Sequence, residues 1–235
     1  LLYILEVLFC SGLLLAFYRL LLVRKVSFRA CRRYLVAAVF LSAVIPALDI
    51  PLYPARTVVY PLPLIAAPPA ENFVQTTGEL PAAGPVVPAG WRRILRPVAV
   101  GGYLTAVFLS LGFLAVRMVG IRRLRRRSRL TDCGAYTLAE HPQIATPFSF
   151  LRTVFLGGGY EGRRRMIVLC HEAGHVRHRH SAERIAVELV RSLFWFNPFV
   201  WIAGRWLQEV HEWEADRDVL DAGYDLTEYR TVIFH

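Results

Sequence analysis

The sequence predicts a mostly α-helical, polytopic membrane protein, in which three N-terminal transmembrane helices precede an α+β domain. Composition is the first reason. Of the 235 residues 55% are hydrophobic, yet the net charge is +10 at pH 7, a combination that is rare in soluble domains. Three apolar runs in the first half of the chain, each bordered by arginines, are the second reason. Beyond them the chain changes to shorter strand-like and helical patterns.

The first apolar run covers residues 1–23 and is interrupted only by Glu6 and Arg19. It is long enough to cross a hydrocarbon core of about 30 Å. A signal peptide is the alternative, but the basic residues follow this run, and no small-residue cleavage site is present. The basic loop 24–33 comes next, and the second apolar run, residues 34–50, is close to the minimum spanning length.

Residues 51–94 are rich in proline, which is incompatible with a regular helix or a central strand, so we expect an extended or disordered loop. The third apolar run, residues 95–120, contains Gly101, Gly102 and Gly112. Small residues of this kind let helices approach closely in a membrane. The sequence therefore predicts a third transmembrane helix here.

Arginine placement predicts the orientation in the membrane. The loop 24–33 and the run 122–129 are both Arg-rich, whereas the proline-rich loop between them carries few charges. This places the N-terminus outside and residues 121–235 in the cytoplasm. A basic excess also occurs in nucleic-acid-binding proteins. Here the charge borders apolar runs, so we expect the lipid bilayer as the partner and no direct contact with nucleic acid.

Residues 171–175 read His-Glu-Ala-Gly-His, within a predicted helix from about Arg163 to His178. His171 and His175 are four residues apart, so a helix places both on one face, where they can hold one Zn²⁺ ion. Glu172 would then take a proton from a water that the metal activates. The alternative is a polar helix face in an Arg- and His-rich segment.

A catalytic zinc ion usually has three protein ligands. A thermolysin-like spacing would place a glutamate where Phe194 stands, and a metzincin pattern fails at His178 and Ser181. Glu212 and Asp216, however, lie four residues apart on a later predicted helix, where like charges repel unless a cation is near. We expect Glu212 as the third ligand and Asp216 as the acceptor of an imidazole N–H. The solvated face of an acidic helix is the alternative.

The His-Glu-x-x-His motif at 171–175, followed by Glu212 and Asp216, resembles the pattern in the membrane-embedded metallopeptidases of the BlaR1/MecR1 family (peptidase family M56). Those proteins carry H-E-x-x-H and a later E-x-x-x-D. Three further stretches match: residues 146–150 (TPFSF), residues 175–181 after the motif, and residues 194–201 (FWFNPFVW), which resemble the W-F-N-P-x-V-W signature. The resemblance implies a cytoplasmic gluzincin-type peptidase domain over residues 121–235. It also implies a set of roles: zinc ligands His171, His175 and Glu212, and general base Glu172.

By this resemblance the protein is a zinc endopeptidase of the bacterial cytoplasmic membrane, which cleaves a cytoplasmic regulator, such as a transcriptional repressor, or itself in signal transduction. Two alternatives remain. A site-2-type intramembrane protease would carry its motif inside an apolar span and add an L-D-G motif, which this chain lacks. A non-catalytic transducer with a structural metal site would have no use for Glu172. Relatives usually continue into a further span, so we expect the chain to be a C-terminally truncated fragment.

The rest of the domain gives weaker indications. Residues 135–139 and 153–156 predict short strands, one of which would pair with extended substrate. The apolar run 193–203 is too short to span, and it predicts either a re-entrant or interfacial element or a buried hairpin. Gly223 predicts a helix C-cap. A further helix is expected to begin near Asp225 or Thr227.

Three further histidines and the cysteines receive no chemical role. His178, His180 and His211 are expected to be solvated polar residues, although metal binding is the alternative for each. The four cysteines show no C-x-x-C spacing and no disulfide framework. Cys170 would point away from the ligand face, so we expect it to pack in the core.

Overall fold

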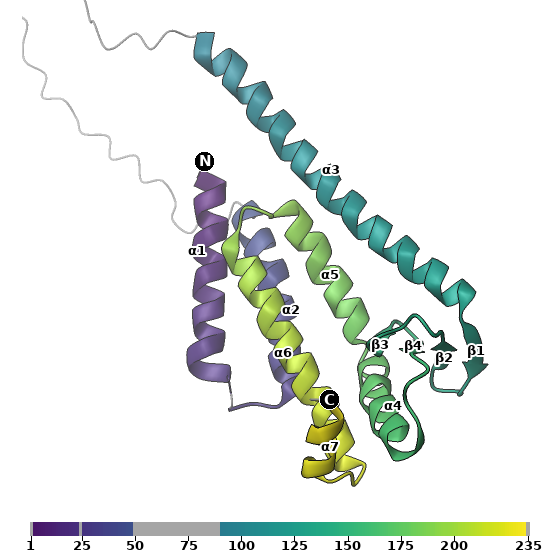
Figure 1. Ribbon diagram of the computed structural model, residues 1–235. Coiled ribbons are helices and arrows are strands. Elements are labelled where there is room, and N and C mark those ends of the chain that lie inside the picture. The colour runs from purple at the N-terminus through teal and green to yellow at the C-terminus, as the bar shows by residue number, and fades with distance from the viewer. Residues whose placement is uncertain (1, 24, 49–89, 234–235) are drawn as a thin grey trace, which may run out of the picture. The chain divides into compact units, whose positions relative to one another are not determined.

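The computed structural model describes residues 2–23, 25–48 and 90–233, which are mostly helical with one small sheet (Figure 1). The chain divides into two units: Leu1–Leu48 with Tyr103–His235, and Asp49–Gly102. In the second unit the described residues form only the first turns of one long helix. The predicted proline-rich loop 51–94 therefore lies almost entirely outside the described residues.

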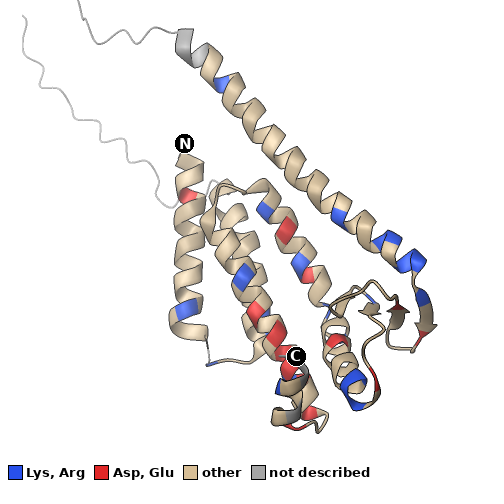
Figure 2. Cartoon of the chain, viewed as in Figure 1, with Lys and Arg blue, Asp and Glu red and all other residues tan. Residues whose placement is uncertain are grey.

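Three long apolar helices agree with the predicted membrane-protein class. They are α1 (Leu2–Phe17), continued by the π-helical turn Tyr18–Leu22; α2 (Phe28–Val44), continued by the 3-10 turn Ile45–Ala47; and α3 (Gly90–Arg127). Among the described residues, the segments Leu2–Leu22, Phe28–Ala47 and Ile94–Arg127 are long and apolar enough to cross a membrane. Figure 2 shows a basic residue near the N-terminal end of α3, then a long uncharged stretch, and then most of its basic residues toward the C-terminal end.

The second helix begins earlier than the apolar pattern predicts. Ser27 caps α2, because its Oγ accepts a hydrogen bond of 3.4 Å from the N–H of Ala30. Part of the expected loop 24–33 is therefore helical. Hydropathy missed this turn because it contains arginines, yet one of them, Arg32, is buried.

The sheet has four strands in the order β1-β2-β4-β3. The strands are β1 (Arg129–Asp132), β2 (Thr137–Glu140), β3 (Phe148–Phe150) and β4 (Thr153–Leu156). β2 pairs with β4 in parallel, and the other two pairings are antiparallel. β2 and β4 correspond to the predicted strands. β1 and β3 were not predicted, since they are too short or too exposed to show a period of two.

Four helices follow the sheet: α4 (Gly162–Arg177), α5 (His180–Leu193), α6 (Pro198–Asp221) and α7 (Leu226–Ile233). Arg179 turns the chain sharply between α4 and α5, with a φ of 58° in the left-handed region. Gly223, with a φ of 89°, follows the C-terminus of α6 as predicted.

The run 193–203 forms the turn of a helical hairpin between α5 and α6. Asn197 caps α6 through a 2.9 Å bond from the N–H of Phe199, and Pro198 occupies the first turn, where it needs no hydrogen-bond partner. Asn197 is fully buried, and its amide donates to Ser11 of α1 at 3.0 Å. Neither α5 nor α6 is among the candidate spans of the described residues.

Helix α6 lies at the centre of the first unit and contacts α1, α2, α4 and α5. Two buried apolar clusters hold α1 and α2 against the hairpin. Their members from α6 are Val200, Ala203, Leu207 and Val210. This packing places the C-terminal half of α6 beside α4, and thus beside the His-Glu-x-x-His motif.

Candidate metal centre

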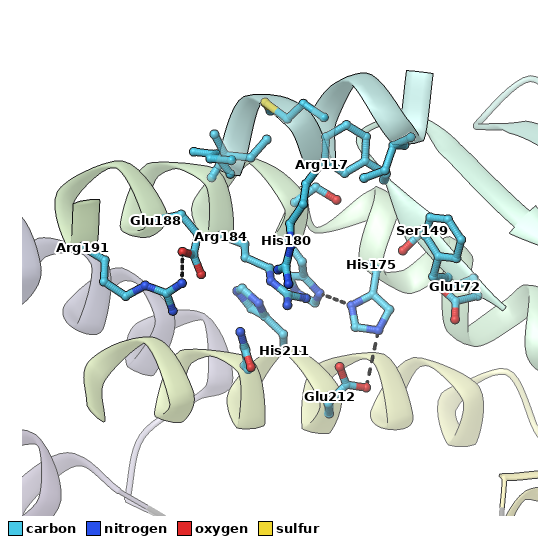
Figure 3. A pocket seen from close by; sticks show the side chains of 18 of the residues that line it. Arg117, Ser149, Glu172, His175, His180, Arg184, Glu188, Arg191, His211 and Glu212 are labelled. Atoms are coloured by element: carbon cyan, nitrogen blue, oxygen red, sulfur yellow. Dashed lines mark hydrogen bonds and ion pairs between the residues drawn. The ribbon is translucent and has the colours of Figure 1, made fainter. Parts of the chain in front are cut away.

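His175 projects from α4 toward Glu212 on α6 (Figure 3). His171, one turn earlier on α4, belongs to the same cluster of potential ligands. The Nε2 atoms of the two histidines are 3.1 Å apart. Glu212 Oε2 lies 3.3 Å from Nε2 of His171 and 3.6 Å from Nε2 of His175. The structure therefore brings together the three residues that the sequence predicts as ligands.

These separations fit one tetrahedral ion. Zinc bonds of about 2.0–2.1 Å hold neighbouring ligand atoms about 3.3–3.4 Å apart at tetrahedral angles. The three observed separations of 3.1, 3.3 and 3.6 Å bracket that value. Two imidazoles with one carboxylate form a known catalytic zinc set, which leaves a fourth position open. Among the described residues, no other group of three potential ligands is close enough to hold an ion.

Residues of α6 and α7 orient His171 through its Nδ1 atom, the ring nitrogen that does not face the potential metal position. Its Nδ1 atom lies 2.8 Å from the hydroxyl of Tyr229 and 3.3 Å from Oδ1 of Asp216. The Tyr229 hydroxyl also donates a hydrogen bond to Asp216. In a consistent arrangement His171 Nδ1–H donates to the Tyr229 oxygen, so Nε2 presents its lone pair to the metal position. Asp216 thus lies where the sequence predicts, with Tyr229 as the nearer contact.

His175 is oriented by a second pair of residues. Its Nδ1 atom lies 2.7 Å from Nδ1 of His180, at the start of α5 (Figure 3). The other nitrogen of His180, Nε2, lies 3.1 Å from Oε2 of Glu214. The Nδ1 atom of His175 therefore reaches a carboxylate through His180, whereas that of His171 lies near Asp216 both directly and through Tyr229.

The prediction that His178, His180 and His211 are solvated is wrong. His180 and His211 are each 3% exposed, and His178 packs against both Asp218 and Glu214. The sequence pattern failed here because the helical hairpin covers the C-terminal end of α4. In contrast, Cys170 packs with the buried side chains of α6 and α7, as predicted.

Burial and the nearby carboxylates have opposite effects on the pKa of His171. Burial lowers its pKa, but Asp216 and Glu212 raise it further, to about 9. Hydrogen bonds from His171 and His175 lower the pKa of Glu212, so that carboxylate is ionised. Burial lowers the pKa of His180, which keeps that ring neutral. The centre thus offers an anionic ligand but needs to lose a proton from His171 before it binds a metal.

Glu172 lies beside the metal position and is 8% exposed. Burial raises its pKa, while His175 and His171 lower it less. A carboxylate with a raised pKa is a stronger base, which suits proton transfer near neutral pH.

A cavity of about 450 Å³ opens over the centre. It is lined by Glu172, by the three potential ligands, by residues of α3 and α5, and by the whole of β3. Because β3 pairs only with β4 among the described strands, its other edge is free to accept a further strand.

The sequence did not indicate the residues that contact and orient the potential ligands. Tyr229 lies on a short helix far along the chain, and nothing in its neighbourhood distinguishes it. Glu214 and His180 stand near the motifs but carry no diagnostic spacing. Arg32, which contacts Glu214 at 2.6 Å, comes from the opposite end of the sequence. Only the packing of the helices brings these side chains to the centre.

Comparison with known proteins identifies the family of this chain. The family model of the BlaR1 peptidase M56 matches residues 13–230, nearly the whole chain. A search of curated proteins gives no match. Peptidases of this family are generally metal-dependent, and the His171, His175 and Glu212 cluster could hold a metal ion. The matched range extends from the first apolar helix through α7, and the chain therefore belongs to the BlaR1 peptidase M56 family.

Proposed function

We propose that this protein is a membrane-embedded zinc endopeptidase that performs regulatory proteolysis. The observation that carries the proposal is the tetrahedral spacing of the nitrogen atoms of His171 and His175 with the carboxylate oxygen of Glu212. Glu172 and the free edge of β3 line the same cavity. Ligands, base and a strand for substrate therefore meet at one place.

Zinc, when bound there, lowers the pKa of a water to about 7 and polarises a peptide carbonyl. His171, His175 and Glu212 would hold the ion. Glu172 accepts the proton of the attacking water and delivers it to the nitrogen of the leaving amine, so one carboxylate acts first as base and then as acid. A side-chain hydrogen bond from Ser149 lowers the pKa of Glu172, which favours the ionised carboxylate that a base needs.

The substrate binds as an extended strand along β3. An edge strand offers unpaired backbone N–H and C=O groups, which bind any peptide backbone, and side-chain pockets then give the specificity. β3 is neither of the two strands that the sequence predicts. Its residues Phe148, Ser149 and Phe150 line the cavity together with Glu172.

In this proposal the three apolar helices cross the bacterial cytoplasmic membrane with the N-terminus outside, and the peptidase domain faces the cytoplasm. The arginines at the C-terminal end of α3 support this orientation, because basic residues favour the cytoplasmic side. The substrate is a cytoplasmic protein, such as a transcriptional repressor, or the protein itself. Helix α4 is not among the candidate spans of the described residues, which disfavours a site-2-type protease.

The test is a cleavage assay on the detergent-purified protein, with a library of peptides from digested cytoplasmic proteins and with the intact protein as its own substrate. Zinc content is measured in the same samples. Glu172→Gln should bind zinc like the wild type and cleave at least about 100-fold more slowly. Glu161→Gln, at the exposed N-cap of α4, is the matched control and should cleave at the wild-type rate.

Two results would contradict the proposal. Wild-type cleavage by Glu172→Gln would exclude this residue as the base. A zinc-loaded wild type that cleaves neither the peptides nor itself would favour the alternative, a signal transducer with a structural metal site.

A further inference from the structure

Arg32 lies buried among three helices of the peptidase domain, although it belongs to α2, a candidate membrane span. Its side chain is 9% exposed. One terminal nitrogen lies 2.6 Å from Oε2 of Glu214 on α6, and the other lies 3.4 Å from Oε1 of Glu183 on α5. The first nitrogen also donates to the backbone carbonyl of His178, at the end of α4, at 3.2 Å. One arginine thus joins α2 to α4, α5 and α6.

The contact with Glu214 leads directly to a metal ligand. Glu214 Oε2 accepts from Arg32 and lies 3.1 Å from Nε2 of His180. His180 Nδ1 lies 2.7 Å from Nδ1 of His175. Four side chains from α2, α6, α5 and α4 therefore form one continuous chain of contacts, of which Figure 3 shows the last link.

Hydrogen-bond chemistry allows one arrangement of protons along this chain. A carboxylate only accepts, so the Nε2 of His180 must carry a proton toward Glu214. In a neutral ring the Nδ1 of His180 is then an acceptor, and it takes the Nδ1–H of His175. The Nε2 of His175 is left with a free lone pair, which is the form that binds a metal.

We propose that Arg32 and Glu214 are positioning residues for His175 and that they act through His180. The metal affinity of the centre then depends on the position of α2. The inference rests on the proposed function, since it assigns His175 as a zinc ligand. His171 is held separately, by Tyr229 and Asp216. A movement of α2 would therefore disturb one ligand and leave the other in place.

A purely structural role for Arg32 is the competing explanation. A buried arginine between two carboxylates neutralises charge wherever it stands, and its removal would leave Glu183 and Glu214 uncompensated. Such a role predicts loss of folding without a specific effect on the metal. The positioning role predicts an effect on the metal in a protein that is still folded.

The experiment measures the zinc dissociation constant of the full chain in detergent, by competition with a chromophoric chelator, together with the visible absorption of the Co²⁺-substituted protein. Glu214→Gln keeps the shape of the side chain but removes its charge. Glu209→Gln, on the same helix and exposed, is the matched control. Arg32→Lys keeps a positive charge between the carboxylates but cannot reach all three acceptors at once. Arg33→Lys, at the exposed neighbouring position, is its control.

We expect Glu214→Gln to weaken zinc binding about 10–100-fold and to change the Co²⁺ spectrum, with wild-type helical circular dichroism. Arg32→Lys should weaken binding in the same direction, and the double variant should be no weaker than Glu214→Gln alone, because both changes break one chain. Both controls should match the wild type.

The inference is overturned if folded Glu214→Gln binds zinc as tightly as the wild type with an unchanged Co²⁺ spectrum. It is also overturned if the effects of Arg32→Lys and Glu214→Gln add in the double variant. Should Glu214→Gln fail to fold, Arg32→Lys with wild-type zinc affinity would be sufficient to reject it. A wild type that binds no zinc contradicts the proposed function itself, so the two failures are distinguishable.

Discussion

Gly174 of α4 packs directly against Ala215 of α6. A Cβ atom at Gly174 would lie 3.4 Å from the Cα of Ala215 and 2.9 Å from Oδ2 of Asp218. The absence of a side chain at Gly174 lets the two helices approach closely. This approach brings Glu212 within 3.6 Å of both ligand histidines.

Gly174→Ala should displace the carboxylate of Asp218, because a Cβ would lie 2.9 Å from its Oδ2, whereas 3.4 Å from the Cα of Ala215 is ordinary van der Waals contact. Overpacking costs about 1–3 kcal/mol, against which the gain in helix propensity of about 1 kcal/mol is smaller. We expect a net loss of about 1 kcal/mol in stability. Gly112→Ala is the control, because a Cβ there meets nothing within 4 Å. Thermal unfolding in detergent measures both variants, and a Gly174→Ala protein as stable as the wild type would refute the close-packing argument.

Tyr229→Phe should weaken zinc binding without unfolding the protein. The substitution removes the hydroxyl that lies 2.8 Å from Nδ1 of His171, while the ring stays to fill its buried site. Loss of such a supporting contact typically costs about 10-fold or more in metal affinity. Tyr224→Phe, in the same apolar cluster, is the control. Equal zinc affinities for Tyr229→Phe and the wild type would show that Asp216 alone orients His171.

Zinc binding should release protons at neutral pH. The pKa of His171 in the metal-free protein is about 9, because Asp216 and Glu212 outweigh the lowering effect of burial. The ring is therefore protonated at pH 7 and must lose its proton to bind metal. Zinc affinity should rise with pH and level off above about pH 9. Calorimetric titration at pH 7, in buffers of different ionisation enthalpy, should report about one proton released per zinc. No proton release would mean that His171 is already neutral.

The sequence predicted the cluster of potential ligands better than the residues that support it. The four-residue spacings of His171 with His175 and of Glu212 with Asp216 are visible in the sequence because helical periodicity is local. β3 escaped detection because three residues cannot display a period, and its place beside Glu172 depends on its pairing with β4. Arg32 was assigned to a basic loop, since an arginine at the end of an apolar run is usually solvated. Its burial depends on contacts with helices more than a hundred residues away, which no local pattern records.

The orientation in the membrane can be tested with a native cysteine. Cys133 follows β1 and is exposed, whereas Cys31 is buried and Cys10 and Cys170 are partly buried. A membrane-impermeant maleimide should label Cys133 in inverted membrane vesicles and leave it unlabelled in intact cells. Cys133→Ser identifies the signal. Labelling of Cys133 in intact cells would place the peptidase domain outside and reverse the proposed topology.

The most direct test of the account is the zinc content and affinity of the purified wild type beside Glu212→Gln. The account predicts about one zinc per wild-type chain. It predicts that Glu212→Gln binds zinc more than about 100-fold more weakly, beyond the loss expected for a supporting residue. Glu209→Gln, one turn earlier on α6, should match the wild type. A Glu212→Gln protein that holds zinc as tightly as the wild type would contradict the assignment of Glu212 as the third ligand, and with it the proposed catalytic centre.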